Sequence, residues 1–182
     1  MNVHEVITAI RADYIEQWDA YVAARRACDP SVYVERRLPM PDDSKLFARS
    51  YVPDISIGDP MTSMSDLVPR SRDGKIPSFD LNSPKLAVHF DDLWWDDVRI
   101  DHDGSFTGEL VSWWFNRWFP PLNAHTPRAE GVSGFIHSVI VDEKWMNVDF
   151  GTAGVSALFN ILSVAQRCGA KTARVTSTRQ PT

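Results

Sequence analysis

Apolar residues recur every three or four positions in residues 3–27, which predicts an amphipathic helix ending at Asp29 and Pro30. A short strand is predicted at 32–37. Residues 39–84 then contain seven prolines and only brief apolar runs, a pattern typical of a long irregular segment or a functional loop. A regular pattern returns at Lys85, so most of the sheet is expected in the second half of the chain.

Alternating and β-branched runs predict strands at 85–91, 94–101, 132–142, 145–150 and 171–177. Helical spacing predicts helices at 108–119 and 152–168, the latter capped by Thr152 and followed by Gly169. The expected fold class is α+β: a mainly antiparallel sheet with helices packed largely on one face. The sheet is mixed if strand 145–150, helix 152–168 and strand 171–177 form a parallel crossover. The length of 182 residues fits a single domain, 1–182, with 179–182 as a tail.

Composition narrows the classes of partner. A pI near 5.5 without clustered Lys and Arg disfavours nucleic acid. No stretch of about 18 apolar residues and no signal peptide is found, so no membrane partner is expected. Cys28 and Cys168 lie far apart without CxxC spacing, which suggests neither a disulfide framework nor zinc. We expect a cytoplasmic protein; its oligomeric state is open.

Acidic and tryptophan residues are concentrated in one segment. Residues 80–103 hold seven aspartates against Lys85 and Arg99, a net charge equal to the −5 of the whole chain. If exposed, such a segment would steer a basic partner toward aromatic anchors. In a strand, Trp94 and Trp95 would point to opposite faces, and the reading that both are covered is equally open. The predicted partner-binding residues are Asp91, Asp92, Trp94, Trp95, Asp96, Asp97, Asp101 and Asp103. Trp114 and Trp118, at helical spacing, are expected in the core.

His89, His102 and the neighbouring aspartates could form either a metal site or a solvated acidic turn. With Gly104 at the sixth place of a calcium loop, Arg99 and Leu110 would stand where oxygen ligands are needed. The acidic turn is therefore favoured and no metal is expected.

Catalytic and nucleotide-binding combinations are present only as loose pairings. His137 with Ser138 and Asp149, or with Cys168, could make a nucleophile and base, but no GxSxG elbow surrounds them. Residues 151–154 precede a helix without a Gly-Lys-Ser/Thr or GxGxxG motif, so no nucleotide and no cofactor is expected.

The C-terminal third carries a Trp-x-x-Val-Asp-Phe-Gly strand from Trp145, a Thr-Ala-Gly-Val-Ser-Ala-Leu helix start from Thr152, and Gly-Ala-Lys-Thr from Gly169. This pattern in a short, acidic, tryptophan-rich chain resembles bacterial immunity proteins that neutralise toxins. The resemblance implies an inhibitor that binds one cognate toxin domain, occludes its active site and has no catalytic residues of its own.

We therefore expect a protein-binding inhibitor whose cognate toxin is basic, such as a nuclease. A small hydrolase-type enzyme is the first alternative, with His89, His102, His137, Asp149 or Cys168 in the site and 39–84 as a lid. A structural or adaptor subunit that seals an oligomer is the second.

Overall fold

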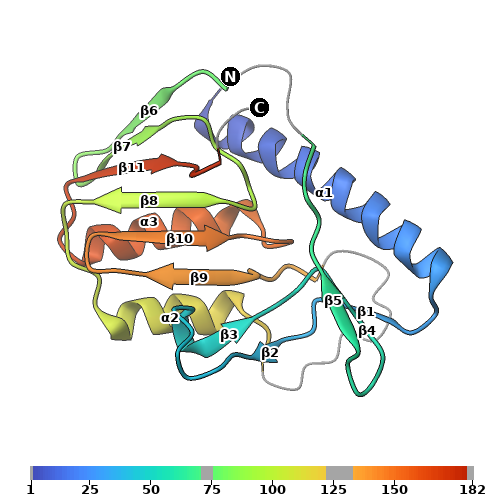
Figure 1. The fold of residues 1–182 in the computed structure, drawn as a ribbon. Coiled ribbons are helices and arrows are strands. Elements are labelled where there is room, and N and C mark those ends of the chain that lie inside the picture. The colour runs from blue at the N-terminus through green and yellow to red at the C-terminus, as the bar shows by residue number, and fades with distance from the viewer. Residues whose placement is uncertain (1, 71–75, 122–132, 180–182) are drawn as a thin grey trace.

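The computed structural model describes residues 2–70, 76–121 and 133–179, and its architecture is the expected α+β fold (Figure 1). One hydrophobic core draws buried side chains from Ile7 near the start of the chain to Val175 near its end.

Helix α1, Val3–Cys28, begins with a capping box between Asn2 and Glu5 and ends at Asp29, as predicted. Its buried side chains recur at helical spacing and include Ile7, Tyr14 and Trp18. The polar opposite face remains exposed.

A six-stranded sheet has the order β6-β7-β11-β8-β10-β9. The strands are β6 (Phe79–Asn82), β7 (Ala87–Phe90), β8 (Val98–His102), β9 (Ser138–Val141), β10 (Trp145–Asp149) and β11 (Thr172–Thr176). Only β7 and β11 pair in parallel, so the sheet is mixed. Strands β10 and β11 run in the same direction with β8 between them, which is the predicted crossover with one strand inserted.

Two helices complete the main layer: α2, Gly108–Trp118, and α3, Val155–Arg167. They pack on each other through a hydrogen bond of 2.9 Å from the indole of Trp114 to the carbonyl of Ala157. Figure 1 shows α3 behind the sheet, and within the described chain no helix lies in front of β7, β11 and β8. The front of the sheet is therefore the face that helices leave open.

In its described parts, 39–70 and 76–84, the segment 39–84 is more regular than its prolines suggest. Together with residues 32–39 it forms short strands: β1 (Val32–Val34), β2 (Leu38–Pro39), β3 (Ser50–Tyr51), β4 (Ile55–Ile57) and β5 (Ser63–Ser65), with a 3₁₀ turn, η1, at Phe47–Arg49. They make a three-stranded sheet, β1-β4-β5, and a two-stranded sheet, β2-β3. Strand β6 of the main sheet also falls in this segment. Strands of two to four residues are too short for alternation to be visible in the sequence.

Three further expectations are wrong in detail. The strand predicted at 94–101 begins only at Val98, because Trp94 to Asp97 form a tight turn closed by an isolated bridge. Thr152 does not cap α3, whose N-cap is Gly154; its side chain is buried elsewhere. Arg179 is not part of a free tail, since its backbone and guanidinium are both hydrogen bonded. Residues 180–182 lie outside the described chain.

In the described ranges, no helix has the length and apolar character needed to cross a bilayer.

Candidate interaction surface

The aspartates between β7 and α2 mainly hold the C-terminal strand β11 in place. Before β11, Asp103 accepts hydrogen bonds from the backbone amides of Lys171 and Thr172, at 2.8 and 3.0 Å. These bonds lower the pKa of Asp103. Beyond β11, Asp97 accepts from the amides of Thr178 and Arg179, at 2.9 and 2.7 Å. Both ends of the strand are thus tied to the acidic segment.

Two of the predicted partner-binding residues are covered. Trp94 is 6% exposed and Trp95 is 1% exposed, so the expectation that one of them projects as a surface anchor is wrong. The indole of Trp95 donates to the carbonyl of Gly151 at 3.0 Å and its ring stacks on Phe150. The guanidinium carbon of Arg179 lies 5.1 Å from the centre of the Trp94 ring. Both tryptophans serve packing within the molecule.

Asp96 is likewise paired inside the molecule. Its side chain is 10% exposed and makes a short ionic hydrogen bond with Arg179. Desolvation raises the pKa of Asp96 in spite of this nearby cation. Asp92 is half-buried in a left-handed backbone conformation, with φ of 36°. Neither residue offers the free, exposed carboxylate that the sequence pattern suggested.

A row of side chains crosses the front of the main sheet. Register pairs Asp80 with His89, His89 with Arg174, Arg174 with Asp101, and Asp101 with Trp145. Because register neighbours point to the same side, the five side chains share one face. The face that bears this row is named the open face; on its opposite side lie the buried Val88, Val98, Ile100 and Val175.

Charges on the open face are paired but accessible. His89 and Asp80 are 2.8 Å apart, with side chains 45% and 61% exposed. Arg174, 59% exposed, donates to Asp91 at 3.0 Å. Arg99 forks onto both oxygens of Asp101 and stacks over Trp145, 4.4 Å from the ring centre. Asp91 and Asp101, two of the predicted partner-binding residues, therefore lie together on the open face.

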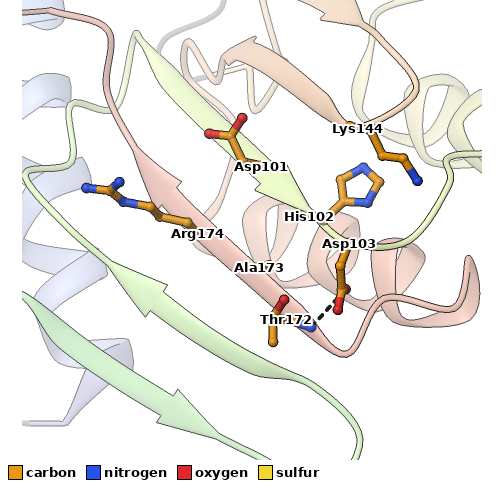
Figure 2. Close-up of a pocket in the computed structure, with 7 residues that line it drawn as sticks. All are labelled: Asp101, His102, Asp103, Lys144, Thr172, Ala173 and Arg174. Carbon is orange, nitrogen blue, oxygen red and sulfur yellow. Dashed lines mark hydrogen bonds between the residues drawn. The ribbon is translucent and has the colours of Figure 1, made fainter.

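An open hollow of about 430 Å³ lies on this face where β8 and β11 meet (Figure 2). Asp101 and Arg174 of the cross-strand row line the hollow, and Thr172 and Asp103 lie below them in this view. Lys144, the residue before β10, lines it beside the end of β8. The hydrogen bond drawn in Figure 2 is the one from the Thr172 amide to Asp103. Charged side chains of both signs thus surround a depression large enough for a side chain.

His102 also lines the hollow but belongs mostly to the core. Its ring packs edge-on against Phe106, with centres 4.0 Å apart. Neither ring nitrogen has a hydrogen-bond partner among the described residues. Burial, with the charge of Lys144, lowers the pKa of His102, so the imidazole is neutral at pH 7.

Beyond one end of the open face lies a buried ionic cluster centred on His137. Its Nε2 is 2.9 Å from Glu35 Oε1, and its Nδ1 is 3.3 Å from Asp54 Oδ1. The hydroxyl of Thr152 donates a short hydrogen bond to the same oxygen of Glu35. Tyr14 of α1 donates to Asp54 at 3.3 Å. The buried ionic cluster therefore joins α1, the chain around β1 and β4, and the main sheet.

Opposite charges keep the cluster ionised although it is buried. Desolvation opposes the charge on His137, but Glu35 and the charges of Asp54 and Asp149 outweigh it and raise the pKa of His137 to about 10. Desolvation would raise the pKa of Glu35, yet the hydrogen bond and charge of His137 bring it below its usual value. Burial raises the pKa of Asp54, and raises that of the half-buried Asp149 to about 8.

The cluster lacks the access that catalysis requires. His137 is 1% exposed and Glu35 is fully covered. A protonated imidazole with both nitrogens engaged by carboxylates cannot act as a general base. Thr152 is also engaged, since its oxygen accepts from the amides of Gly134 and Phe135, at 3.0 and 3.2 Å. The geometry is that of a structural ion-pair network.

Other candidate groups are not assembled into a site. Cys28 and Cys168 are free thiols. Within the described residues, no group of His, Cys, Asp or Glu has an arrangement that could hold a metal ion. The turn before α3 is occupied by Arg11, which donates to the carbonyls of Ala153 and Thr152 at 2.6 and 2.8 Å.

Sequence reasoning did not identify Glu35, Asp54 or Thr152 as members of one cluster. They lie up to 117 positions apart, and no spacing rule connects them. Arg174 and Trp145 were missed on the open face because each lies singly in a strand of ordinary composition. Their alternation with buried neighbours was the available signal.

Comparisons of the chain with protein-family models, curated proteins and solved structures found no match in any of the three.

Proposed function

We propose that the chain is a protein-binding inhibitor, an immunity protein that occludes the active site of one cognate bacterial toxin domain. The observation that carries the proposal is the open face, where a cross-strand row of charged side chains ends at Trp145 on the side of the sheet that no described helix covers. The resemblance of the C-terminal third to toxin-immunity proteins supplies the class of partner.

The chemistry of the open face suits recognition of a polar protein surface. Arg99 and Trp145 form an aromatic and cationic pair, the residue types that recur at binding hot spots. Asp80, Asp91 and Asp101 present carboxylates that are paired with His89, Arg174 and Arg99 but remain accessible, so a competing base can reach them. A basic toxin would be steered by the chain's net charge of −5.

The hydrolase alternative is less well supported, because His137, one of its candidate residues, is shielded from any substrate. His137 is 1% exposed and is held between two carboxylates. The adaptor alternative remains compatible with the open face, and the mass of the purified chain at several concentrations distinguishes it.

The experiment is capture from the native cells on the tagged chain, with washes at low and high salt, followed by identification of bound proteins by mass spectrometry. The captured protein is then purified and its activity is measured with and without the chain. The proposal predicts one stoichiometric partner whose activity is lost on binding. A partner that keeps its full activity in the complex would refute inhibition.

A variant series assigns the inhibition to the open face. Trp145→Ala removes the ring beneath Arg99 and should weaken binding by about 2 kcal/mol, a loss typical of a hot spot. Trp113→Ala is the matched control, because Trp113 is 50% exposed and belongs to helix α2, outside the main sheet. Equal losses for the two variants would remove the open face from the proposal.

A further inference from the structure

The turn at residues 94–97 forms a pocket around a guanidinium group. Arg179 Nη2 donates to Asp96, and the Arg179 guanidinium lies over the Trp94 ring at 5.1 Å. Proteins commonly recognise arginine with two groups: an aromatic face on which the guanidinium stacks, and a carboxylate within hydrogen-bonding distance. Arg179 itself is 31% exposed, whereas the Asp96 carboxylate is 10% exposed.

The backbone next to this arginine is recognised as well. Asp97 accepts from the amides of Thr178 and Arg179 and from the Thr178 hydroxyl. Ser177 contributes its hydroxyl, which accepts from the amide of Trp94 at 2.7 Å. Residues 177–179 are therefore held as an extended peptide would be held in a binding site, by main-chain contacts plus one side-chain pocket.

The contact with Arg179 does not use the full hydrogen-bonding capacity of the Asp96 carboxylate. Arg179 bonds to Asp96 Oδ2, while Asp96 Oδ1 is buried and has no hydrogen-bond partner among the described residues. A guanidinium can bond to both oxygens of a carboxylate at once, and this bidentate arrangement is stronger than a single bond. An arginine with more freedom than Arg179 would make that second bond.

We propose that Trp94, Asp96 and Asp97 form an arginine-binding site, occupied by the chain's own Ser177–Arg179 segment and able to take an arginine of a binding partner when that segment is displaced. The inference deepens the proposed function and rests on it for the identity of the natural ligand. It also explains why Trp94 and Asp96 have the residue types of an interface while they are covered.

The test uses the full chain and a synthetic probe, the tripeptide acetyl-Ser-Thr-Arg-amide. Arg179→Ala vacates the pocket, and binding is followed by the NMR signal of the Trp94 indole, assigned with Trp94→Phe. Arg179→Ala should bind the peptide at least about tenfold more tightly than the unaltered chain, in which the tethered segment competes at millimolar effective concentration.

Specificity controls separate arginine recognition from general charge attraction. The citrulline peptide, neutral and of similar shape, should bind Arg179→Ala at least about tenfold more weakly than the arginine peptide. Adding Asp96→Asn to Arg179→Ala should abolish the difference between the two peptides. Arg174→Ala is the matched control, because it removes an exposed arginine that pairs with Asp91 and should bind no better than the unaltered chain.

The inference is overturned if folded Arg179→Ala shows no shift of the Trp94 signal at about 10 mM peptide, above the effective concentration of a tethered segment, or if it binds both peptides equally. If Arg179→Ala does not fold, Arg179→Lys keeps the charge without the bidentate fork and must show the same order of affinities. No toxin is present in this assay, so its failure leaves the inhibitor proposal standing, and failure to capture a partner leaves the arginine site standing.

Discussion

Gly151 is the residue on which the buried ionic cluster depends most directly. Its φ is +47°, and a Cβ placed there would lie 2.2 Å from Cδ2 of the His137 ring. Because the ring is fixed by two carboxylates, it cannot move aside. Glycine is required both for the backbone conformation and for the close approach of the imidazole.

Gly151→Ala should therefore lower the free energy of unfolding by about 2 to 4 kcal/mol, as overpacking and left-handed strain add. Urea denaturation measures this. Gly134→Ala is the matched control, since Gly134 has φ of +85° but nothing within 4 Å of an added Cβ. It should cost only about 1 kcal/mol, the conformational part alone. Equal costs at the two positions would show that the His137 ring is not held in place.

Asp97 is the second residue whose role the structure redefines. It accepts from Asn147, from Thr178 and from the amide of Arg179. Asp97→Ala should cost about 1 to 3 kcal/mol, because several donors, some of them partly buried, lose their shared acceptor. In hydrogen exchange, the variant should increase the exchange rate of the β11 amides more than that of the α1 amides. Asp43→Ala, at an exposed position, is the control and should change neither. Unchanged exchange in β11 would contradict the assigned role.

At the scale of elements, the buried ionic cluster makes the packing of α1, β1 and β4 on the main sheet dependent on pH. His137 has its pKa raised from 6.5 to about 10 on folding. The folded protein thus binds more protons than the unfolded chain across this range, and stability falls as pH rises through it. Asp149, with its pKa raised from 3.8 to about 8, acts in the same direction up to that value.

The free energy of unfolding should therefore decline between about pH 6.5 and 10, with a slope of at most about 1.4 kcal/mol per pH unit for each proton released. Denaturation at several pH values measures the slope. Asp149→Asn should reduce the slope below pH 8 and, because it removes a charge that raises the pKa of His137, should end the decline at a lower pH. A constant or rising stability over this range would contradict an ionised His137 in the core.

Elements were predictable where their pattern is long and regular. Helix α1 and strands β10 and β11 were placed to within two residues, because burial alternates or recurs along their full length. The strand predicted from Trp94 was too long, because residues 94–97 form a turn. Their tryptophans are a residue type common in strands, so the sequence did not separate the turn from the strand that follows. Threonine is a common helix N-cap, but the hydroxyl of Thr152 is hydrogen bonded to the buried carboxylate of Glu35.

The candidate surface was predictable only in part for a related reason. Composition located the acidic segment but could not tell which carboxylates are consumed inside the molecule. Asp96 and Asp97 bind residues more than 80 positions away, whereas Asp101 binds Arg99 and stays accessible. Charge reversal at Asp96 and Asp97 would therefore disturb the fold, so it cannot by itself measure binding to a partner.

At the scale of the whole molecule, the chain has a sealed side and an exposed one. The buried ionic cluster joins the layers, while the open face carries accessible charges beside Trp145. An inhibitor of this design would bind through a rigid sheet and need little rearrangement. The net charge of −5 would act mainly on the rate of association.

The most direct measurement is the association rate between the chain and its captured partner, over a range of salt concentrations, for two double charge reversals. Asp80→Lys with Asp101→Lys alters the open face, and Glu16→Lys with Asp19→Lys makes the same change of charge on the exposed side of α1. We predict that the first slows association at low salt by about tenfold or more and that the second changes it little. Equal rates for the two variants would contradict the open face as the binding surface.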